Sequence, residues 1–354
     1  MKLREEQISK SEFNCGIKEL TDEEVNILAS HLEENNWFIE FRDIFNLFNE
    51  IDFKVREDLK NYDLSYIIRP FIYYVKNKVC KYMPKLHNIR FSEEVMTDIL
   101  SAFGTEVIKI IQKSFIIELH SDKNVEEIEG ENSSDRFKYF LKSKFTSSEN
   151  LIEFYSKYAA LTRVILVRTD YYINNTIDSI DRLDKNFESI NKELDLKLKT
   201  NKIVKINQSQ GDSHQKGKSV SQFIFEDGTK IIYKPKNLKV EKTYYELIEF
   251  FNENTNLLKL PKIKGFYQDE FTFEECVEYQ GCTSEKQIEN FYERFGETIA
   301  IIYMLCGTDF HFENVIALGE NPYLIDMETL FQNKSQIKYD QDLNNIILEA
   351  QGYI

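Results

Sequence analysis

Glycine and proline are spread unevenly along this chain, and this distribution constrains the fold more than any other feature. Only three of the twelve glycines lie in residues 1–200, and the other nine lie in residues 201–354. Two of the five prolines, Pro70 and Pro84, precede residue 200. Because glycine and proline mark most turns and loops, residues 1–200 are predicted to form long helices with few interruptions.

The segment 151–194 is the clearest helical pattern in this first part. Apolar and aromatic residues recur there every three or four positions, as they do along one face of a helix. The residues of that face are Leu151, Phe154, Tyr155, Tyr158, Leu161, Val164 and Ile165. The segment 121–135, SDKNVEEIEGENSSD, is acidic and polar, so we expect an exposed loop there.

Past residue 200 the pattern becomes that of short strands. Residues 219–225 and 230–234 are rich in β-forming side chains and flank Asp227-Gly228, which is a strong signal for a hairpin. A helix over 240–253 and two further strands over 259–279 are expected to follow.

The last part of the chain predicts a long helix and a second hairpin. The amphipathic segment 288–307 reads as a helix that Gly307 closes at its C-terminal cap. The runs VIAL and YLI are expected to form short strands around the turn GENP. This order of elements matches a protein-kinase-like small lobe followed by the start of a large lobe.

Four residues occupy positions that phosphoryl transfer requires. A kinase-like site needs a strand lysine, a catalytic Asp placed before a metal-binding Asn, and a metal-binding Asp on the next hairpin. Lys234 ends the second strand of the first hairpin, Asp309 and Asn314 are separated by FHFE, and Asp326 follows the second hairpin. We predict that Asn314 and Asp326 bind Mg²⁺ and that the site binds ATP.

Each of these matches is weak alone, and Asp309 and Asn314 have plain structural alternatives. Asp309 can be a helix-end or Asx-turn residue, and Asn314 can be a turn residue. Asp326 is harder to explain, because an aspartate on an apolar strand is costly to bury without a partner or a metal. Three matches in the right order and context favour the kinase-like interpretation.

The stretch GDSHQKGKSV before Lys234 departs from the glycine-rich loop of ordinary protein kinases. It carries Asp212 and His214, an acid–base pair that a nucleotide-clamping loop does not need. Between Gly211 and Lys242 there are seven lysines and four acidic residues, a local charge of +3 in a chain of net charge −15. This basic segment is typical of a site for phosphates, although a solvated loop with an incidental histidine is the plainer alternative.

Composition excludes several classes of protein. The net charge of −15 and the pI near 5.0 argue against nucleic-acid binding. The five cysteines are scattered, so neither a disulfide framework nor a zinc site is predicted. With no signal-peptide pattern and no apolar run long enough to span a bilayer, we expect a cytoplasmic protein without a transmembrane segment.

Four blocks resemble the dehydratase region of the class II lanthipeptide synthetases. They are GDSHQKGKSV, IIYKPKNL, YERFGETIAIIYMLCGTDFHFENVIALGENPYLIDMETLF, and the helical run YSKYAALTRVI…IDRLDKNFESI. The resemblance implies a fold similar to lipid kinases with helical elaborations ahead of it. It also implies that ATP phosphorylates Ser or Thr of a ribosomal precursor peptide, with its leader and core. Elimination of the phosphate would then give dehydroamino acids.

The resemblance also implies a role for each matching residue. Lys234 would hold the nucleotide phosphates, Asp309 would orient or deprotonate the hydroxyl, and Asn314 and Asp326 would hold magnesium. His311 lies in the same matching loop as a further required polar group.

Four other residues complete this expectation. Asp212 and His214 match an Asp-x-His associated with handling the phosphorylated intermediate. Glu328 matches the family with a less defined role, and Glu246 is the candidate partner of Lys234.

We therefore expect an α+β protein with three parts. These are a helical region over 1–200, a kinase-like small lobe over 201–280, and the beginning of a large lobe over 281–354. The chain resembles the N-terminal third of a synthetase, and the arginine and threonine that the family uses in elimination are expected beyond Ile354. The cyclase domain is absent too, which predicts an interrupted gene product, a fragment, or one half of a split enzyme that works with a separate C-terminal part.

Two further functions stay open at this stage. One is a truncated, non-catalytic module that binds the precursor peptide through its helical region. The other is a small-molecule phosphotransferase of kinase-like fold, which gives no reason for Asp212 and His214 or for the long helical prefix.

Overall fold

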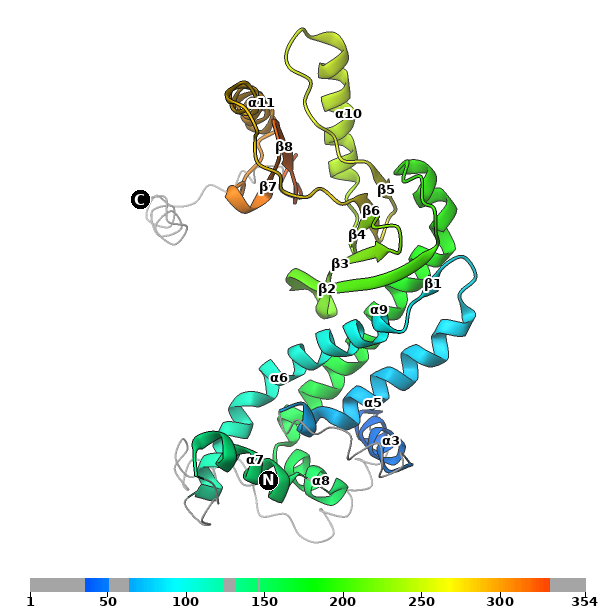
Figure 1. Cartoon of the computed structure of the whole chain (residues 1–354), viewed down its shortest axis with the longest axis vertical. Coiled ribbons are helices and arrows are strands. Elements are labelled where there is room, and N and C mark those ends of the chain that lie inside the picture. Colours follow the sequence, from blue (N-terminus) through cyan, green and yellow to red (C-terminus); the bar gives the residue numbers. More distant parts are fainter. Residues whose placement is uncertain (1–35, 51–63, 124–130, 146, 332–354) are drawn as a thin grey trace, which may run out of the picture. The chain divides into compact units, whose positions relative to one another are not determined.

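The computed structural model describes residues 36–50, 64–123, 131–145 and 147–331 of the 354. Over these residues the protein is α+β, with helices and a mostly antiparallel sheet (Figure 1). The packing divides the chain into two compact units. Unit 1 combines residues 1–235 with 272–276, and unit 2 combines residues 236–271 with 277–354. The predicted boundary at residue 200 falls inside unit 1.

Helices form most of unit 1. In chain order they are α3 (Asn36–Glu50), α5 (Ser65–Tyr82), α6 (Glu94–Lys123), α7 (Ser133–Lys144), α8 (Ser148–Lys157) and α9 (Ala159–Glu193), with a short 3₁₀ turn η1 (Met83–Lys85) after α5. Helix α5 packs against α3, α6 and α9. Among the helices that the structure describes, none is both long enough and apolar enough to cross a membrane.

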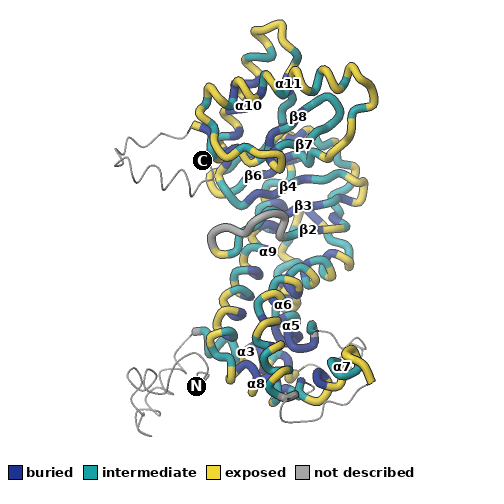
Figure 2. Tube along the Cα trace, turned by 90° about the vertical axis from the view of Figure 1, so that its left-hand side faces the viewer, coloured by how far each residue is buried: buried dark blue, intermediate teal, exposed yellow. Residues whose placement is uncertain are grey.

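Aromatic side chains hold these helices together around Tyr155. Its ring is fully buried and lies 5.2 Å from Phe71 and 5.4 Å from Phe154, measured between centroids. The phenol donates a hydrogen bond to the carbonyl of Ile67 at 2.8 Å, which satisfies its polar end in the core. Burial raises the pKa of Tyr155 well above its ordinary value. Figure 2 shows the buried positions running along α5 and through the strands of the sheet.

The helical region differs from the sequence expectations in two details. The segment 151–194 is helical as predicted, but Tyr158 leaves helical geometry (φ −108°, ψ 51°) and divides it between α8 and α9. The break changes which residues face the core, so Val164 is 49% exposed although the spacing places it on the apolar face. The acidic segment 121–135 is also not all loop, since α6 reaches Lys123 and α7 begins at Ser133 with Asn132 as its N-cap.

A sheet completes unit 1. Its strands are β1 (Arg90–Phe91), β2 (Lys202–His214), β3 (Lys218–Phe225), β4 (Lys230–Lys234) and β6 (Thr272–Glu275), and within the unit they lie in the order β1-β2-β3-β4-β6. Strand β1 runs parallel to β2, and the other pairs are antiparallel. The predicted hairpin around Asp227-Gly228 is confirmed as β3–β4, with Gly228 at φ 87° in its turn.

Asp184 of α9 fastens the helix to the loop that leads into β1. Its carboxylate accepts hydrogen bonds from the backbone N–H groups of His87, Asn88 and Ile89 at 2.7–3.1 Å. Asp184 itself is buried, so these bonds replace the water that its charge would otherwise keep. The contact fixes the edge of the sheet relative to α9.

Unit 2 contains α10 (Lys239–Asn254), β5 (Gly265–Tyr267), α11 (Glu285–Met304), the 3₁₀ turn η3 (Phe312–Asn314), β7 (Val315–Leu318) and β8 (Asn321–Leu324). Strands β7 and β8 form the second predicted hairpin, with Val315 opposite Leu324. The core of this unit consists of Tyr244, Tyr245, Ile248, Leu260, Ile263, Ile301, Leu324, Met327 and Leu330. It joins α10 and α11 to the residues that follow the hairpin.

Gly307 does not end α11 as predicted. The left-handed residue is Cys306 (φ 54°), and the amides of Cys306 and Gly307 bond to the carbonyls of Tyr303 and Ile302, which is a Schellman motif. Gly307 is needed for another reason: a Cβ there would lie 2.7–2.8 Å from side chains of Ile302, Leu330 and Phe310. The glycine lets the next loop pass close to the core.

Glu40 of α3 is expected to make the stability of unit 1 depend on pH. Burial, followed by the nearby carboxylate of Asp170, raises the pKa of Glu40 from 4.5 to about 7. Because the folded pKa lies above the unfolded one, the folded state favours protonated Glu40, and stability falls as pH rises from about 4.5 to about 7. We expect Glu40→Gln to remove this part of the pH dependence.

The only tryptophan of the chain, Trp37, lies in α3 and reports on this unfolding by fluorescence. Wild type should lose more stability than Glu40→Gln between about pH 5 and about pH 8 in urea titrations. Equal losses in both proteins would contradict the assignment to Glu40.

Candidate functional site

The predicted site residues fall in both units. Unit 1 holds Asp212, His214 and Lys234. Unit 2 holds Asp309, His311, Asn314 and Asp326. The second group lies on the two loops that flank the β7–β8 hairpin, and these loops are fastened to each other.

Asn314 makes hydrogen bonds both within its own loop and to the loop on the other side of the hairpin. Its side chain is buried, and its Oδ1 accepts a hydrogen bond from the amide of His311 at 3.0 Å. Its carbonyl accepts from the amide of Ile325 at 2.9 Å, on the other side of the hairpin. His311 caps the turn through Nδ1, which accepts from the amide of Glu313 at 3.3 Å. A further bond runs from the hydroxyl of Thr329 to the carbonyl of Thr308.

Asp309 and Asp326 both adopt the left-handed backbone conformation. Their φ angles are 60° and 62°, a region that non-glycine residues rarely occupy outside constrained turns. Both side chains are exposed. The expectation that Asp326 sits on an apolar strand is therefore wrong. Strand β8 ends at Leu324, and the left-handed turn at Asp326 directs the carboxylate outward while Met327 is buried.

A lysine that the sequence reasoning missed pairs with Asp326. The ammonium of Lys236 lies 3.0 Å from Oδ1 of Asp326 and 2.7 Å from Oε2 of Glu328. Burial disfavours the charged form of Lys236, but the hydrogen bonds to Glu328 and Asp326 outweigh it, and the pKa of Lys236 is raised. The sequence KPK could have drawn attention to Lys236, because it places a second lysine two residues after Lys234. In the structure Pro235 separates the two lysines, and they belong to different units.

Helix α10 makes hydrogen bonds to the end of β8 and to the loop that follows it. Glu241 is buried, and its Oε1 accepts a hydrogen bond from the amide of Met327 at 3.4 Å. The hydroxyl of Tyr245 donates to the carbonyl of Leu324 at 3.3 Å. Sequence reasoning gave Glu241 no role, because nothing in a helical pattern distinguishes a buried first-turn glutamate from a solvated one.

Strand alternation explains how Lys234 is placed in unit 1. The hydroxyl of Tyr233 accepts a hydrogen bond from Arg182 of α9 at 2.8 Å, so Tyr233 faces the helix. Lys234, one residue later, points to the opposite face of the sheet. There its ammonium lies 2.8 Å from the carboxylate of Glu274 on β6, and the two side chains are 11% and 3% exposed.

The ion-pair partner of Lys234 is therefore the carboxylate of Glu274 on β6. Glu246, the candidate partner from the sequence, is exposed and lies 4.0 Å from Lys242 of its own helix. Helical position alone indicated Glu246, whereas the pairing of β4 with β6 could be known only from the fold.

The lysine-rich segment carries less net positive potential than its composition indicates. Four of its seven lysines meet carboxylates from outside the segment: Lys234 with Glu274, Lys236 with Asp326 and Glu328, Lys239 with Asp269, and Lys242 with Glu246. These pairs neutralise charge locally. These four lysine side chains are held by ion pairs, so their charges do not form a continuous basic surface.

The predicted acid–base pair lies on the last part of β2. The backbone of His214 pairs with Lys218, but the side chains of Asp212 and His214 lie outside the described residues. The turn that follows rests on α9. Asn175 donates a hydrogen bond to the carbonyl of Lys216 at 3.0 Å, and a Cβ on Gly217 (φ 71°) would lie 2.9 Å from the guanidinium of Arg168.

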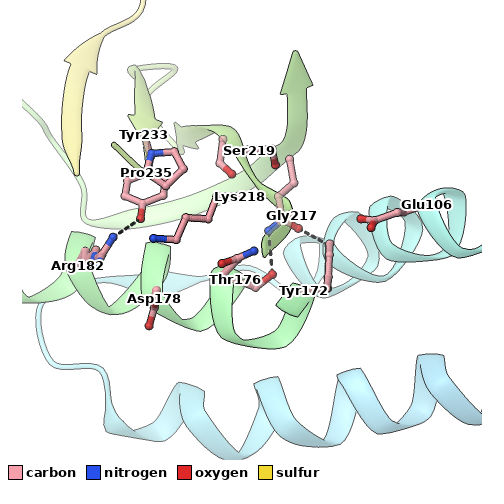
Figure 3. A pocket seen from close by; sticks show the side chains of 13 residues that line it. Glu106, Tyr172, Thr176, Asp178, Arg182, Gly217, Lys218, Ser219, Tyr233 and Pro235 are labelled. Carbon is pink, nitrogen blue, oxygen red and sulfur yellow. Dashed lines mark hydrogen bonds between the residues drawn. The ribbon is translucent and has the colours of Figure 1, made fainter. Parts of the chain in front are cut away.

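A pocket lined mainly by residues with polar side chains lies beside this turn, between the sheet and α9 (Figure 3). Its lining includes Tyr172, Thr176, Arg182, Lys218 and Tyr233. Figure 3 shows the side chain of Lys218 extending over α9, and the hydrogen bond from Arg182 to Tyr233. Since Tyr233 faces this pocket, the pocket lies on the sheet face opposite Lys234.

The oxygen donors of unit 2 are of the chemical type that a hard divalent cation prefers. Within the described ranges, no group of three or more His, Cys, Asp and Glu side chains is placed to hold a metal ion. Magnesium, however, takes few protein ligands and keeps several waters. The carboxylates of Asp326 and Glu328 already converge on one cation, the ammonium of Lys236.

The chain belongs to a family whose model matches residues 158–350, more than half of the sequence. That family is described as "Domain of unknown function (DUF4135)". The match begins at Tyr158, where α8 ends, and it includes all seven predicted site residues. The DUF4135 domain is found in class II lanthipeptide synthetases.

A curated relative agrees with this assignment. The chain is 25% identical to the "Lacticin 481/lactococcin biosynthesis protein LcnDR2" of Lactococcus lactis subsp. lactis. The similarity covers 68% of this chain and 27% of that protein, so the chain spans about a quarter of its relative's length. The resemblance to class II lanthipeptide synthetases that the motif blocks predict is confirmed.

Proposed function

We propose that this chain is the dehydratase part of a lanthipeptide synthetase. In this proposal it phosphorylates Ser or Thr of a ribosomal precursor peptide with magnesium-ATP and then eliminates the phosphate. One observation carries the proposal: Asp309, Asn314 and Asp326 lie on two loops fastened by the bond from Ile325 to Asn314. These loops fall in the family segment of a chain related to a lacticin biosynthesis protein.

The kinase step is assigned to the residues of the paired loops and to Lys234. Magnesium-ATP would supply the phosphoryl group, with Asn314 and Asp326 as the residues that hold the metal. Asp309, exposed and set by its left-handed backbone, accepts the proton of the attacking hydroxyl. Lys234 would contact the nucleotide phosphates, as the family resemblance implies, and His311 orients the loop through its cap on Glu313.

The elimination step is assigned to Asp212 and His214. It removes the α-proton of the phosphorylated residue, breaks the Cβ–O bond and releases phosphate, which leaves a Cα=Cβ double bond. An acid–base pair serves this step because one group takes the proton and the other protonates or stabilises the leaving oxygen. A larger synthetase contributes further residues, so we propose that the rest of such a protein acts together with this chain.

The proposal is tested with the full chain, magnesium-ATP and the precursor peptide encoded beside it. The remaining synthetase part is supplied as a separate protein. Mass spectrometry should detect phosphorylated or dehydrated peptide, and Asp326→Asn should lower its yield at least about a hundredfold.

Asn tolerates the left-handed backbone of position 326, so this variant should fold normally. A peptide that stays unmodified with all parts present would reject the proposal. Modification that persists at wild-type rate in Asp326→Asn would reject the assigned site.

A further inference from the structure

The ammonium of Lys236 lies between two carboxylates. They belong to Asp326 and Glu328, whose oxygens are 3.0 Å and 2.7 Å from the ammonium. The side chain of Lys236 is 28% exposed, and those of Asp326 and Glu328 are about half exposed, at 51% and 49%, so water screens their charges only in part. The two carboxylates, separated along the chain by Met327 alone, would repel each other without a cation between them.

This pairing is distinct from that of the other lysine in KPK. Lys234 is in unit 1 and meets Glu274 on the strand next to its own, where both side chains are nearly buried. Lys236 is in unit 2, on the segment that leads into α10, and its partners lie just beyond β8. An ammonium on such a segment, more exposed than that of Lys234, can move away at lower cost than one within a sheet.

We propose that Lys236 is an exchangeable counter-cation of the metal site. In the metal-free chain it holds Asp326 and Glu328 together, and a divalent cation displaces its ammonium when it binds. The inference rests on the proposed function, because it uses Asp326, one of the two magnesium ligands assigned there, and it adds Glu328 as a neighbouring carboxylate. It adds a residue, Lys236, that sets the affinity of that site and keeps its carboxylates convergent before the metal arrives.

The alternative is a static role, in which Lys236 stays in place and binds both carboxylates with or without metal. The two roles predict opposite effects of removing the ammonium. If metal and lysine compete, Lys236→Met changes the formal charge of the three side chains from −1 to −2 and strengthens metal binding. If the lysine is a permanent support, its removal lets the carboxylates separate and weakens metal binding.

The experiment measures Mn²⁺ binding to the full chain by electron paramagnetic resonance, at low ionic strength and without nucleotide. We expect Lys236→Met to bind Mn²⁺ roughly tenfold more tightly than wild type, as removal of a neighbouring unit charge implies. Lys236→Arg keeps the charge and should bind like wild type. Lys239→Met is the matched control, because it removes the same charge nearby, from a pair with Asp269.

A second measurement, the melting temperature, tests whether Lys236→Met changes the stability of the fold. Without metal, Lys236→Met should melt at a lower temperature than wild type, and saturating Mn²⁺ should raise its melting temperature by more. Mn²⁺ affinity that is unchanged or weaker in Lys236→Met would overturn the inference. The same holds if Lys239→Met tightens binding equally.

Asp326→Asn separates this inference from the proposed function. If wild type binds Mn²⁺ and Asp326→Asn does not, the metal site stands, and the result for Lys236→Met decides the inference alone. If wild type binds no Mn²⁺ even with ATP added, the metal part of the proposed function fails, and the inference fails with it.

Discussion

Replacing Asp309 with Asn should strongly slow phosphate transfer to the precursor peptide while leaving the fold intact. A general base contributes about 10²- to 10⁴-fold to such a step, so we expect a loss of that size in the rate of phosphopeptide formation. Asn keeps the size of the side chain and tolerates the left-handed backbone at φ 60°. The loss should therefore come from the missing base and not from a disturbed loop.

Two comparisons make this result specific. Binding of magnesium-ATP should be nearly unchanged in Asp309→Asn, because Asp309 is assigned to the hydroxyl and not to the metal. Glu313→Gln removes a charge from the same loop, where the side chain is 70% exposed, and should react at close to the wild-type rate. Equal losses in Asp309→Asn and Glu313→Gln would instead indicate a general electrostatic effect of the loop.

Replacing Lys234 with Met should destabilise unit 1 by about 3–5 kcal/mol, the usual effect of leaving a buried charge without its partner. Glu274 is 3% exposed, and its Oε1 already has no hydrogen-bond partner among the described residues. The unfolding of unit 1 can be followed by the fluorescence of Trp37 during urea titration.

The double variant Lys234→Met, Glu274→Gln separates stability from function. It removes both charges, and we expect most of the stability to return, since replacing both members of a buried pair is often nearly neutral. Nucleotide binding should stay lost, because the ammonium that we assign to the nucleotide phosphates is still absent. Nucleotide binding that returns with stability would show that Lys234 acts only in folding.

Local patterns predicted the secondary structure of the second half well. Both hairpins were marked by turn residues between β-forming runs, and both are confirmed as β3–β4 and β7–β8. The end of α11 was harder to predict. A glycine near the end of a helix can be needed either for a left-handed backbone conformation or for close packing against neighbouring residues. At Gly307 the reason is packing, and Cys306 takes the left-handed position.

The pairing of charges could not be predicted from local patterns. Lys236 lies 90 residues before Asp326 in the chain, and Lys234 meets Glu274 only because β6 returns beside β4. A motif search finds residues that resemble a known order, and it found Lys234, Asp309, Asn314 and Asp326. It assigns no role to the neighbours that hold them, because those contacts depend on the tertiary fold.

The sheet of unit 1 is completed by a strand that is synthesised late, β6. Residues 272–276, which include β6, reach the sheet only after the 36 residues Lys236–Phe271 have been synthesised. Until then β4 is an open edge, and Lys234 lacks the carboxylate of Glu274. The emerging chain therefore exposes this edge until β6 has been synthesised. A fragment that stops at Pro235 would keep that open edge permanently and would be prone to aggregate.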